Sequence, residues 1–256
     1  MPFVELPQTD IDFEGGAKKP VLVLAHSLGV TRAMWNPLIP ALQQHWRILR
    51  YDLRGHGDSA QPDGELTVEA LGQDLLRLTE SLPRFSFCGV SLGGLIGQWL
   101  GIHAPEKIDH LILANTAMKF GEAAAWNARI ELVASRGLAP VVEGTLERWF
   151  TAEFRSRHPE QVAPVRAMLE ACNPVGYIAC CAAVRDADFR SLASRIQAST
   201  LVLAGSLDPV STPDDCRALA AQIPAAEYIE LPAAHLAAVE CPEKFAAAIR
   251  SFVADR

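Results

Sequence analysis

Short, continuous apolar segments recur along the chain and alternate with amphipathic ones. Each segment has the length of a strand, and they lie at Pro20–Ala25, Arg47–Leu53, Phe85–Val90, Leu111–Ala114 and Leu201–Ala204, with a weaker copy at Ala226–Leu231. A strand that is covered by helices on both faces of a parallel sheet has this continuous apolar character. The segments therefore predict the buried strands of one parallel sheet.

The stretches between these strands carry apolar residues at helical spacing. They lie at Trp35–Leu42, Thr67–Leu82, Leu92–His103, Asp214–Ile223 and Pro242–Asp255. Strands that alternate with helices predict an α/β fold, in which a mostly parallel sheet is covered by helices. Near the N-terminus, Phe3–Phe13 is expected to add a small antiparallel hairpin at the edge of the sheet.

The alternation stops between residues 117 and 190. This stretch has no clear buried strand, and its pattern predicts helices at Ala123–Ser135, Val141–Phe150, Gln161–Ala171 and Val175–Asp186. A helical insertion after a sheet strand is expected to lie over the strand ends, where open α/β sheets bind ligands. We therefore divide the chain into an α/β core, residues 1–116 and 191–256, and a helical lid, residues 117–190.

Length, composition and charge narrow the classes of function. The 256 residues, half of them hydrophobic, suffice for one large α/β domain with an insertion. A net charge of −7 without a Lys/Arg-rich run argues against a nucleic-acid partner. No apolar stretch approaches the length of a membrane span, and the first ten residues lack the basic and apolar regions of a signal peptide. We expect a cytoplasmic protein.

The six cysteines (Cys88, Cys172, Cys180, Cys181, Cys216 and Cys241) show no CxxC spacing. Most have apolar neighbours, so we expect reduced thiols rather than disulfides or metal ligands. The sequence also contains no metal-binding cluster and no dinucleotide fingerprint. We therefore expect neither a metal nor another cofactor.

The predicted lid differs in charge from the rest of the chain. Residues 118–190 contain nine Lys/Arg and nine Asp/Glu, so the remaining fourteen and twenty-one carry the whole net charge of −7. A neutral, arginine-containing lid on an acidic body favours an anionic substrate beneath the lid.

The segment Gly89-Val90-Ser91-Leu92-Gly93 joins a predicted strand to a predicted helix. The five-residue pattern alone is weak evidence, but this position is that of a nucleophile elbow. In such an elbow the serine lies on a sharp, strained turn, and small residues on either side of it prevent clashes. Ser91 is therefore our candidate nucleophile.

A serine hydroxyl needs a base to take its proton and a carboxylate to orient that base. In serine hydrolases built on this kind of sheet, the chain order is serine, acid, histidine. Asp208 follows the Leu201–Ala204 strand and His235 follows the last strand, so both are expected on loops at the carboxyl ends of strands. We therefore assign Asp208 as the orienting acid and His235 as the base.

Other acids fit this order less well. Asp208 precedes a proline and has the alternative role of a turn residue. Asp214 and Asp215 are rival acids, although they resemble the start of a helix, whereas Asp52 and Asp58 precede the serine and have the wrong order. The proposed base, whose alternative is a surface histidine, is the only one of the seven histidines that follows the last predicted strand.

Acyl transfer also needs two backbone N–H groups aimed at the developing oxyanion. Leu92 supplies one at the start of a helix, where the helix dipole helps. The loop His26-Ser27-Leu28-Gly29 supplies the other, with Leu28 as the first candidate and Ser27 as the second. We expect the histidine of this loop, like the segment Arg54-Gly55-His56-Gly57, to have a structural role.

Together these motifs resemble the α/β-hydrolase superfamily. HSLG, YDLRGHGDS, GVSLGG, AGSLDP and PAAHL are distributed over essentially the whole chain. A narrower resemblance, to the 3-oxoadipate enol-lactonases, lies in SLGG, QWLG, HAPE and LANTA and in the earlier LTVE. His26 stands where this family often has asparagine, and Leu92 where methionine is common, but neither difference removes a catalytic group.

The resemblance implies hydrolysis of 3-oxoadipate enol-lactone to 3-oxoadipate in the β-ketoadipate route of aromatic catabolism, which includes protocatechuate degradation. It implies that His235 takes the Ser91 proton, that Asp208 holds the imidazole, and that the Leu28 and Leu92 N–H groups bind the oxyanion. Water activated by the histidine then releases the product from the acyl-enzyme.

The implied partner is a small, anionic lactone, whose carboxylate needs a cationic or amide donor. Arg129 in the first lid helix is our candidate donor, and its alternative is a solvated lid residue. Trp126 and Trp149 are candidate walls of the pocket, and their alternative is packing within the lid. The sequence leaves the choice between monomer and homo-oligomer open.

Two other functions remain open on the same fold. A carboxylesterase or a carbon–carbon bond hydrolase uses the same three residues, with its specificity in the lid. A non-catalytic receptor binds a small ligand and signals through a partner, and shows at most a single slow acylation. A haloalkane-type reaction is disfavoured, because it uses a carboxylate nucleophile where Ser91 stands.

Overall fold

A computed structural model describes residues 19–254 as a parallel sheet between layers of helices. The strands are β1 (Val21–Ala25), β2 (Arg47–Tyr51), β3 (Phe85–Val90), β4 (Ile108–Ala114), β5 (Ser199–Gly205) and β6 (Glu227–Leu231). Their order is β2-β1-β3-β4-β5-β6, and every neighbouring pair is parallel. The predicted α/β fold class is confirmed. The hairpin expected at Phe3–Phe13 lies outside the described residues.

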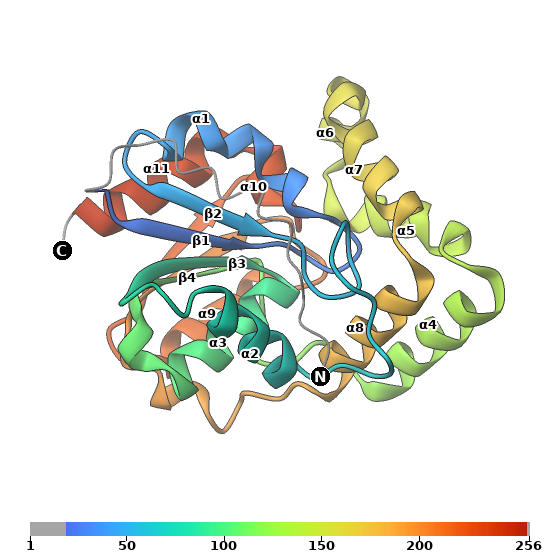
Figure 1. The fold of residues 1–256 in the computed structure, drawn as a ribbon. Coiled ribbons are helices and arrows are strands. Elements are labelled where there is room, and N and C mark those ends of the chain that lie inside the picture. Colours follow the sequence, from blue (N-terminus) through green and yellow to red (C-terminus); the bar gives the residue numbers. More distant parts are fainter. Residues whose placement is uncertain (1–18, 255–256) are drawn as a thin grey trace.

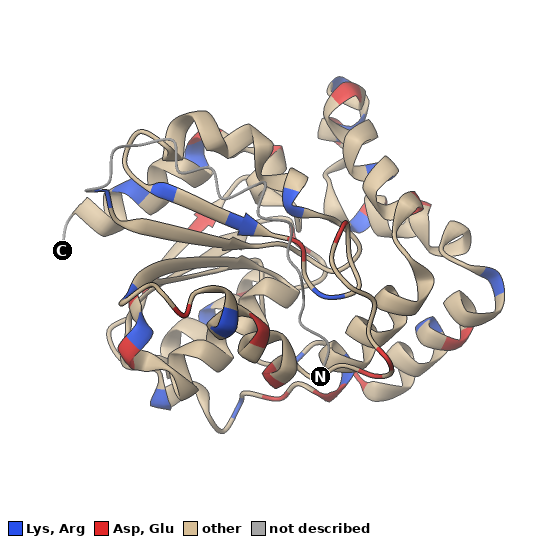
Figure 2. Ribbon diagram, in the orientation of Figure 1, with Lys and Arg blue, Asp and Glu red and all other residues tan. Residues whose placement is uncertain are grey.

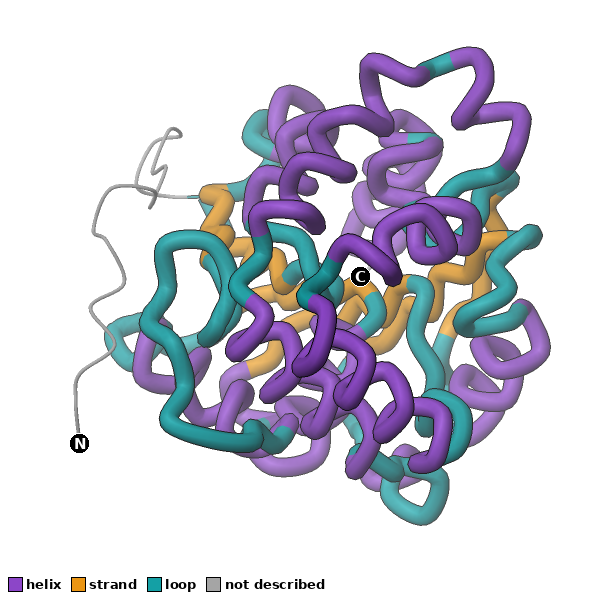
Figure 3. The backbone as a smooth tube through the Cα atoms, turned by 90° about the vertical axis from the view of Figure 1, so that its right-hand side faces the viewer, coloured by secondary structure: helices purple, strands orange, loops and turns teal. Residues whose placement is uncertain are grey.

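Helices cover both faces of this sheet (Figure 1). One face carries α2 (Val68–Leu78), α3 (Leu92–His103) and α9 (Pro213–Gln222); the other carries α1 (Ile39–Leu42), α10 (Ala237–Glu240) and α11 (Pro242–Ala254). In the view of Figure 3 the strands lie between layers of helices. Every residue of β1 and β3 is buried, which explains their continuous apolar sequence.

Two predicted helices differ from those in the structure. The segment expected to be helical at Trp35–Leu42 is a 3₁₀ helix over Arg32–Leu38 followed by the single turn of α1, because its two prolines lack the N–H donors of a continuous α-helix. The helix that begins after Thr67 ends at Leu78 rather than at Leu82. The proline directly after Leu82 disfavours helical backbone there.

Between β4 and β5 the chain forms five α-helices. They are α4 (Ala123–Arg136), α5 (Ala139–Trp149), α6 (Ala152–Arg157), α7 (Pro159–Ala171) and α8 (Pro174–Asp186). Sequence patterns predicted four of them but not α6, a short helix capped by the Thr151 hydroxyl, which accepts from the Phe154 N–H at 3.2 Å. All five fall within the predicted lid and form a layer at the carboxyl ends of the strands (Figure 1). The exact division into core and lid remains a prediction.

Charged residues of both signs are interspersed over the helices, including α4–α8 (Figure 2). Within residues 19–254 no single helix has the length and apolar character needed to cross a membrane, although the bent pair α7 and α8 meets that test together.

The lid is anchored where α8 meets the turn after β2. Gly55 and Gly176 are in backbone contact, and a Cβ atom added at Gly176 would overlap the Gly55 carbonyl oxygen. Gly55 has a φ of +83°, a conformation that glycine adopts without strain. The Leu66 N–H also donates to the Ala179 carbonyl at 3.2 Å. This close approach therefore holds α8 on the core.

Gly176→Ala is expected to reduce the free energy of unfolding by about 1–3 kcal/mol, because the added methyl group must displace backbone. Gly144→Ala on α5 is a matched control, since its Cβ would approach only the Arg148 guanidinium, at 3.5 Å. That control is expected to be stabilised by up to about 1 kcal/mol through helix propensity. Urea unfolding followed by tryptophan fluorescence measures both. An unchanged midpoint for Gly176→Ala would contradict the anchoring role.

Candidate active site

Ser91 lies on a strained turn between β3 and α3. Its φ of 57° and ψ of −112° fall in a region that residues with a side chain rarely adopt. Its N–H donates to the Ala114 carbonyl at 3.1 Å, and its carbonyl accepts from the Thr116 hydroxyl at 2.9 Å. The end of β4 thus holds the turn through both backbone groups of the serine.

The glycines beside Ser91 are required by space. A Cβ atom at Gly89 would overlap the Gly93 carbonyl, and one at Gly93 would overlap the Ala25 carbonyl. The strand, turn and helix predicted for a nucleophile elbow are therefore all present. The same contact places the start of α3 directly against the loop that follows β1.

Asp208 and His235 form a buried pair on the loops after β5 and β6. The His235 Nδ1 lies 2.8 Å from the Asp208 Oδ2, and the two side chains are almost completely inaccessible. Asp208 also accepts from the N–H groups of Val210 and Ser211, the Ser211 hydroxyl and the Asn115 amide. Because Nδ1 is engaged, Nε2 is the ring nitrogen left for proton transfer.

The electrostatic surroundings keep Asp208 ionised. Burial by itself would raise its pKa, but the charge and hydrogen bond of His235, with the donors from Ser211 and Val210, hold the pKa below its ordinary value. An ionised carboxylate in this position fixes the histidine tautomer and stabilises a positive charge on the imidazole ring.

Within residues 19–254 the Ser91 hydroxyl forms no hydrogen bond. The structure therefore joins Asp208 directly to His235, whereas Ser91 is linked to this pair only through the residues at the end of β4. Hydrogen bonds between catalytic groups are often loose in ligand-free enzymes and tighten on binding.

The rival acids lie elsewhere. Asp214 and Asp215 begin α9, as their sequence pattern indicates, and Asp215 forms a capping box with Thr212. Asp52 and Asp58 both form ion pairs with Arg32, near the loop after β1. Within the described chain, Asp208 is the acid whose carboxylate contacts His235.

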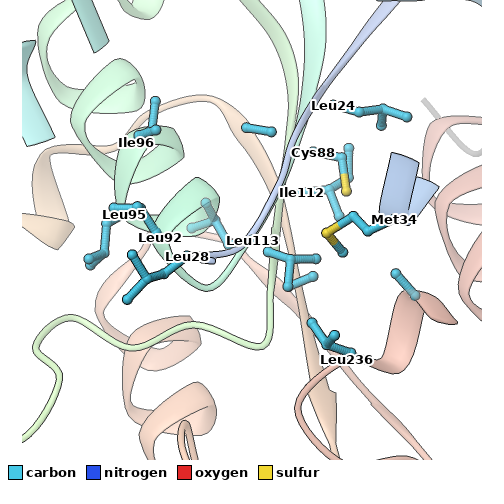
Figure 4. Packing of buried hydrophobic residues seen from close by; sticks show 14 of the residues in the cluster. Leu24, Leu28, Met34, Cys88, Leu92, Leu95, Ile96, Ile112, Leu113 and Leu236 are labelled. Carbon is cyan, nitrogen blue, oxygen red and sulfur yellow. The ribbon is translucent and has the colours of Figure 1, made fainter. Parts of the chain in front are cut away.

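The two predicted oxyanion residues lie on adjacent segments. Leu28 is on the loop after β1 and Leu92 is at the start of α3 (both labelled in Figure 4), and Gly93 packs against the backbone of Ala25 and His26. Leu92 is the first residue of α3, where no intrahelical acceptor exists for its N–H. In the part of the chain that the structure describes, neither the Leu28 nor the Leu92 N–H donates to a protein acceptor. Both groups are therefore available to an oxyanion.

Two buried histidines support the loop that carries Leu28. The His26 Nδ1 donates to the Ser27 carbonyl at 2.7 Å, and its Nε2 accepts from the Leu53 N–H at 2.9 Å. The His56 Nε2 accepts from the Gly29 N–H at 2.9 Å. The structural role expected for His26 and for the turn that contains His56 is thus observed as hydrogen bonds.

Arg129 extends from α4 into the interior of the lid. Its guanidinium donates to the Tyr177 hydroxyl and to the Thr145 hydroxyl, each at 2.8 Å. The Tyr177 ring packs against Gly29, where an added Cβ atom would lie 3.0 Å from the ring. One side chain therefore separates Arg129 from the candidate oxyanion loop.

A second guanidinium lies beside Arg129. Arg148 reaches the Thr145 hydroxyl at 3.5 Å, and partial burial together with the positive charge of Arg129 lowers its pKa. Within residues 19–254 neither arginine forms an ion pair with an acid. Two adjacent guanidinium groups without a carboxylate partner favour an anion at this place.

The two candidate tryptophans have different surroundings. Trp149 is buried at the end of α5, and its carbonyl accepts from the Leu236 N–H at 3.0 Å, next to His235. Trp126 is half-buried, and its indole N–H donates to the Phe120 carbonyl at 2.7 Å. These contacts place Trp149, rather than Trp126, beside the loop of His235.

Sequence reasoning missed three side chains of this site. They are Asn115 and Ser211, which donate to Asp208, and Glu240, which accepts from the Ala234 N–H at 2.9 Å and from the Thr151 N–H at 3.3 Å. Glu240 therefore ties the loop of His235 to the start of α6. Asn115 directly follows β4, and its place at a strand's carboxyl end is the signal that could have identified it.

All six cysteines are free thiols, and five of them are buried. Burial raises the pKa of each thiol, so they are protonated near neutral pH. Within residues 19–254 no group of three or more His, Cys, Asp or Glu side chains is arranged to hold a metal ion.

Comparison with known proteins identifies the class. The model of the alpha/beta hydrolase family matches residues 22–248. The chain therefore belongs to the alpha/beta hydrolase family, and this membership supports hydrolase activity.

Within that family the resemblance to 3-oxoadipate enol-lactonases is confirmed. 3-Oxoadipate enol-lactonase 2 of Acinetobacter baylyi is 41% identical over 239 residues, covering 93% of this chain and 90% of that protein. The crystal structure of the enol-lactonase from Burkholderia xenovorans LB400 has a TM-score of 0.91 at 36% identity, covering 92% of each chain. A hydrolase from Pseudomonas aeruginosa PA01 has a TM-score of 0.90 at 44% identity, covering 93% of this chain and 91% of that one.

Acid is expected to destabilise the protein through His26 and His56, the buried histidines that support the loop after β1. Burial is the largest cause that lowers the pKa of His26 to about 4 and that of His56 to about 3, from an ordinary value of 6.5. At pH values between 6.5 and the lowered pKa values, these two side chains bind more protons in the unfolded chain than in the folded one. The free energy of unfolding should therefore be highest above pH 6.5 and fall as the pH decreases toward 4.

His56→Gln isolates this effect, because glutamine keeps an acceptor for the Gly29 N–H but does not titrate. His56 faces His26, Asp52, Arg54 and Cys180, which remain in the variant. Urea unfolding at successive pH values should show that the free energy of unfolding falls less steeply with decreasing pH in His56→Gln than in the wild type. The exposed His45→Gln is the control, and equal slopes in all three proteins would contradict the assignment.

Proposed function

We propose that the chain hydrolyses 3-oxoadipate enol-lactone to 3-oxoadipate, with Ser91 as nucleophile, His235 as general base and Asp208 as orienting acid. The observation that supports this proposal is the buried Asp208–His235 pair at 2.8 Å, which hydrogen bonds from the end of β4 link to the strained Ser91 turn. The enol-lactonase relatives support the choice of substrate.

Acylation opens the lactone ring. The His235 Nε2 takes the Ser91 proton while the serine oxygen attacks the lactone carbonyl. The Leu28 and Leu92 N–H groups stabilise the oxyanion, and the negative charge of Asp208 stabilises the imidazolium. The ring C–O bond then breaks, and the enol oxygen leaves with the proton from His235. An enol is a better leaving group than an amine, and it subsequently forms the ketone.

Deacylation uses the same groups in the reverse direction. His235 takes a proton from water, and the resulting hydroxide attacks the acyl-enzyme carbonyl in the same oxyanion hole. The Ser91 oxygen leaves and recovers its proton from the histidine, and 3-oxoadipate departs. No step needs a metal or another cofactor. The pathway we propose is the β-ketoadipate route of aromatic catabolism in the cytoplasm.

The substrate carboxylate is assigned to Arg129. Its guanidinium is fixed by the Tyr177 and Thr145 hydroxyls, has no acidic partner in the described part of the chain and lies one side chain from the candidate oxyanion loop. Arg148 adds a second positive charge there. Trp149 is the wall residue next to His235, whereas Trp126 packs within the lid.

This pair of arginines favours an anionic substrate over the neutral ester of a general carboxylesterase. A carboxylesterase or carbon–carbon bond hydrolase is therefore the second candidate, and a non-catalytic receptor is the third.

Ser91→Ala is expected to reduce kcat/KM for freshly generated enol-lactone by about 10⁴-fold or more, with the fold intact. Loss of the ultraviolet absorbance of the lactone measures hydrolysis, and circular dichroism checks folding. Retained turnover in this variant would contradict the mechanism. If the wild-type protein ignored the lactone but rapidly hydrolysed a simple aryl ester, the esterase alternative would replace the proposal. A single slow acylation would indicate a receptor.

Arg129→Gln is expected to raise KM for the enol-lactone by about 10- to 100-fold, because one charge-assisted contact with the carboxylate is lost. The methyl ester of the same lactone lacks that charge, so its kcat/KM should change little. Arg136→Gln, an exposed change on the same helix, is the control. An equal loss on both substrates would show that Arg129 acts only by supporting the lid.

A further inference from the structure

The carboxyl end of β4 contacts the segments of all three proposed catalytic residues. The Ala114 carbonyl and the Thr116 hydroxyl hold the backbone of Ser91. Asn115, between them, extends its side chain to the other two segments. A single strand end therefore contacts the nucleophile, the acid and the loop of the base.

The Asn115 side chain is completely buried and its amide makes two hydrogen bonds. Its Nδ2 donates to the Asp208 Oδ2 and to the Ala234 carbonyl, each at 3.1 Å. Both partners accept only, so they determine which end of the amide faces them. Ala234 directly precedes His235. The amide thus links the acid loop to the histidine loop.

The backbone at this position also favours asparagine. Asn115 has a φ of +44°, in the left-handed region that asparagine tolerates better than most residues. Its N–H donates to the Leu203 carbonyl at 2.8 Å, which holds this conformation. Gly205 leaves the space that the amide occupies, since a Cβ atom there would lie 3.0 Å from the Asn115 Nδ2.

We propose that Asn115 is a positioning residue for the acid–base pair: its amide fixes Asp208 relative to His235 and withdraws negative charge from the Asp208 carboxylate. The inference rests on the proposed function, because it assumes that Ser91, Asp208 and His235 act together. It assigns Asn115 a second consequence, which is an influence on the pH dependence of Ser91 reactivity.

The charges around Asp208 determine the direction in which the pH dependence would shift if the Asn115 donor were lost. The groups that face Asp208 are His235, the Ser211 hydroxyl and N–H, the Val210 N–H and the Asn115 amide, with the protonated Cys216 thiol nearby. An acceptor in place of the amide donor would leave more negative charge opposite the imidazole. That charge would stabilise the positive form of the ring, and the acid limb of the rate profile would move to higher pH.

The test is the pH dependence of Ser91 modification by a fluorophosphonate probe, which needs no natural substrate. Asn115→Asp is nearly isosteric and replaces the donor by an acceptor. We expect its rate on the plateau to fall about tenfold or more and its acid midpoint to rise by about one pH unit. Asn115→Gly keeps the positive φ and removes the amide, and we expect a smaller rise in the midpoint together with a lower rate.

Ile112→Val is the matched control, because it truncates a fully buried side chain on the same strand without touching Asp208. It should lower the melting temperature and leave the acid midpoint unchanged. If both Asn115 variants behaved like Ile112→Val, Asn115 would have only a structural role and the inference would be overturned. Asn115→Gly decides the matter if Asn115→Asp does not fold.

The wild-type protein separates this inference from the proposed function. Labelling of the wild type but not of Ser91→Ala supports the proposed nucleophile, whatever the Asn115 variants do. If the wild type were not labelled at all, the proposed function would fail, and this inference with it.

Discussion

The burial of the Asp208 carboxylate is the constraint on which the arrangement of the site depends. A buried charge is strongly unfavourable unless hydrogen bonds and an opposite charge replace its water. Asp208 obtains these partners from three places: its own loop, the amide of Asn115 after β4 and the ring of His235 after β6. The carboxyl ends of three strands must therefore meet around it. An ionised carboxylate held in this way can orient a histidine without large motions of the surrounding loops.

Close backbone contact imposes a second constraint. The Ser91 turn is strained, and it is held because neighbouring backbone occupies the space that side chains at Gly89 and Gly93 would need. The same packing brings the start of α3 against the loop that carries Leu28. The proposed nucleophile and the proposed oxyanion donors are therefore positioned by one steric arrangement of backbone groups.

The lid is coupled to this site by polar contacts rather than by packing alone. Arg129 reaches the oxyanion loop through Tyr177, and Glu240 joins the start of α6 to the loop of His235. The arginine proposed to bind the substrate and the loops of the proposed catalytic residues are thus physically connected. A carboxylate bound at Arg129 and Arg148 would neutralise two charges that have no acidic partner among residues 19–254.

The sequence by itself determined the features that depend on short-range pattern. Continuous apolar runs marked the buried parallel strands, and the Gly89–Gly93 segment marked the elbow, because strand burial and a crowded turn each restrict a few consecutive residues. Ser91, Asp208 and His235 were assigned from their order in the chain and from their places directly after predicted strands.

Only the tertiary structure decided what joins these parts. Asn115 is 93 residues from Asp208 and 119 from Ala234, and no local pattern records such contacts. The inward course of Arg129 was likewise set by distant partners, the Thr145 and Tyr177 hydroxyls, whereas the 3₁₀ character before α1 and the short helix α6 follow from prolines and a capping threonine that periodicity does not register. Periodicity reports which face of an element is buried; the donors that satisfy a buried charge are determined by which segments the fold brings together.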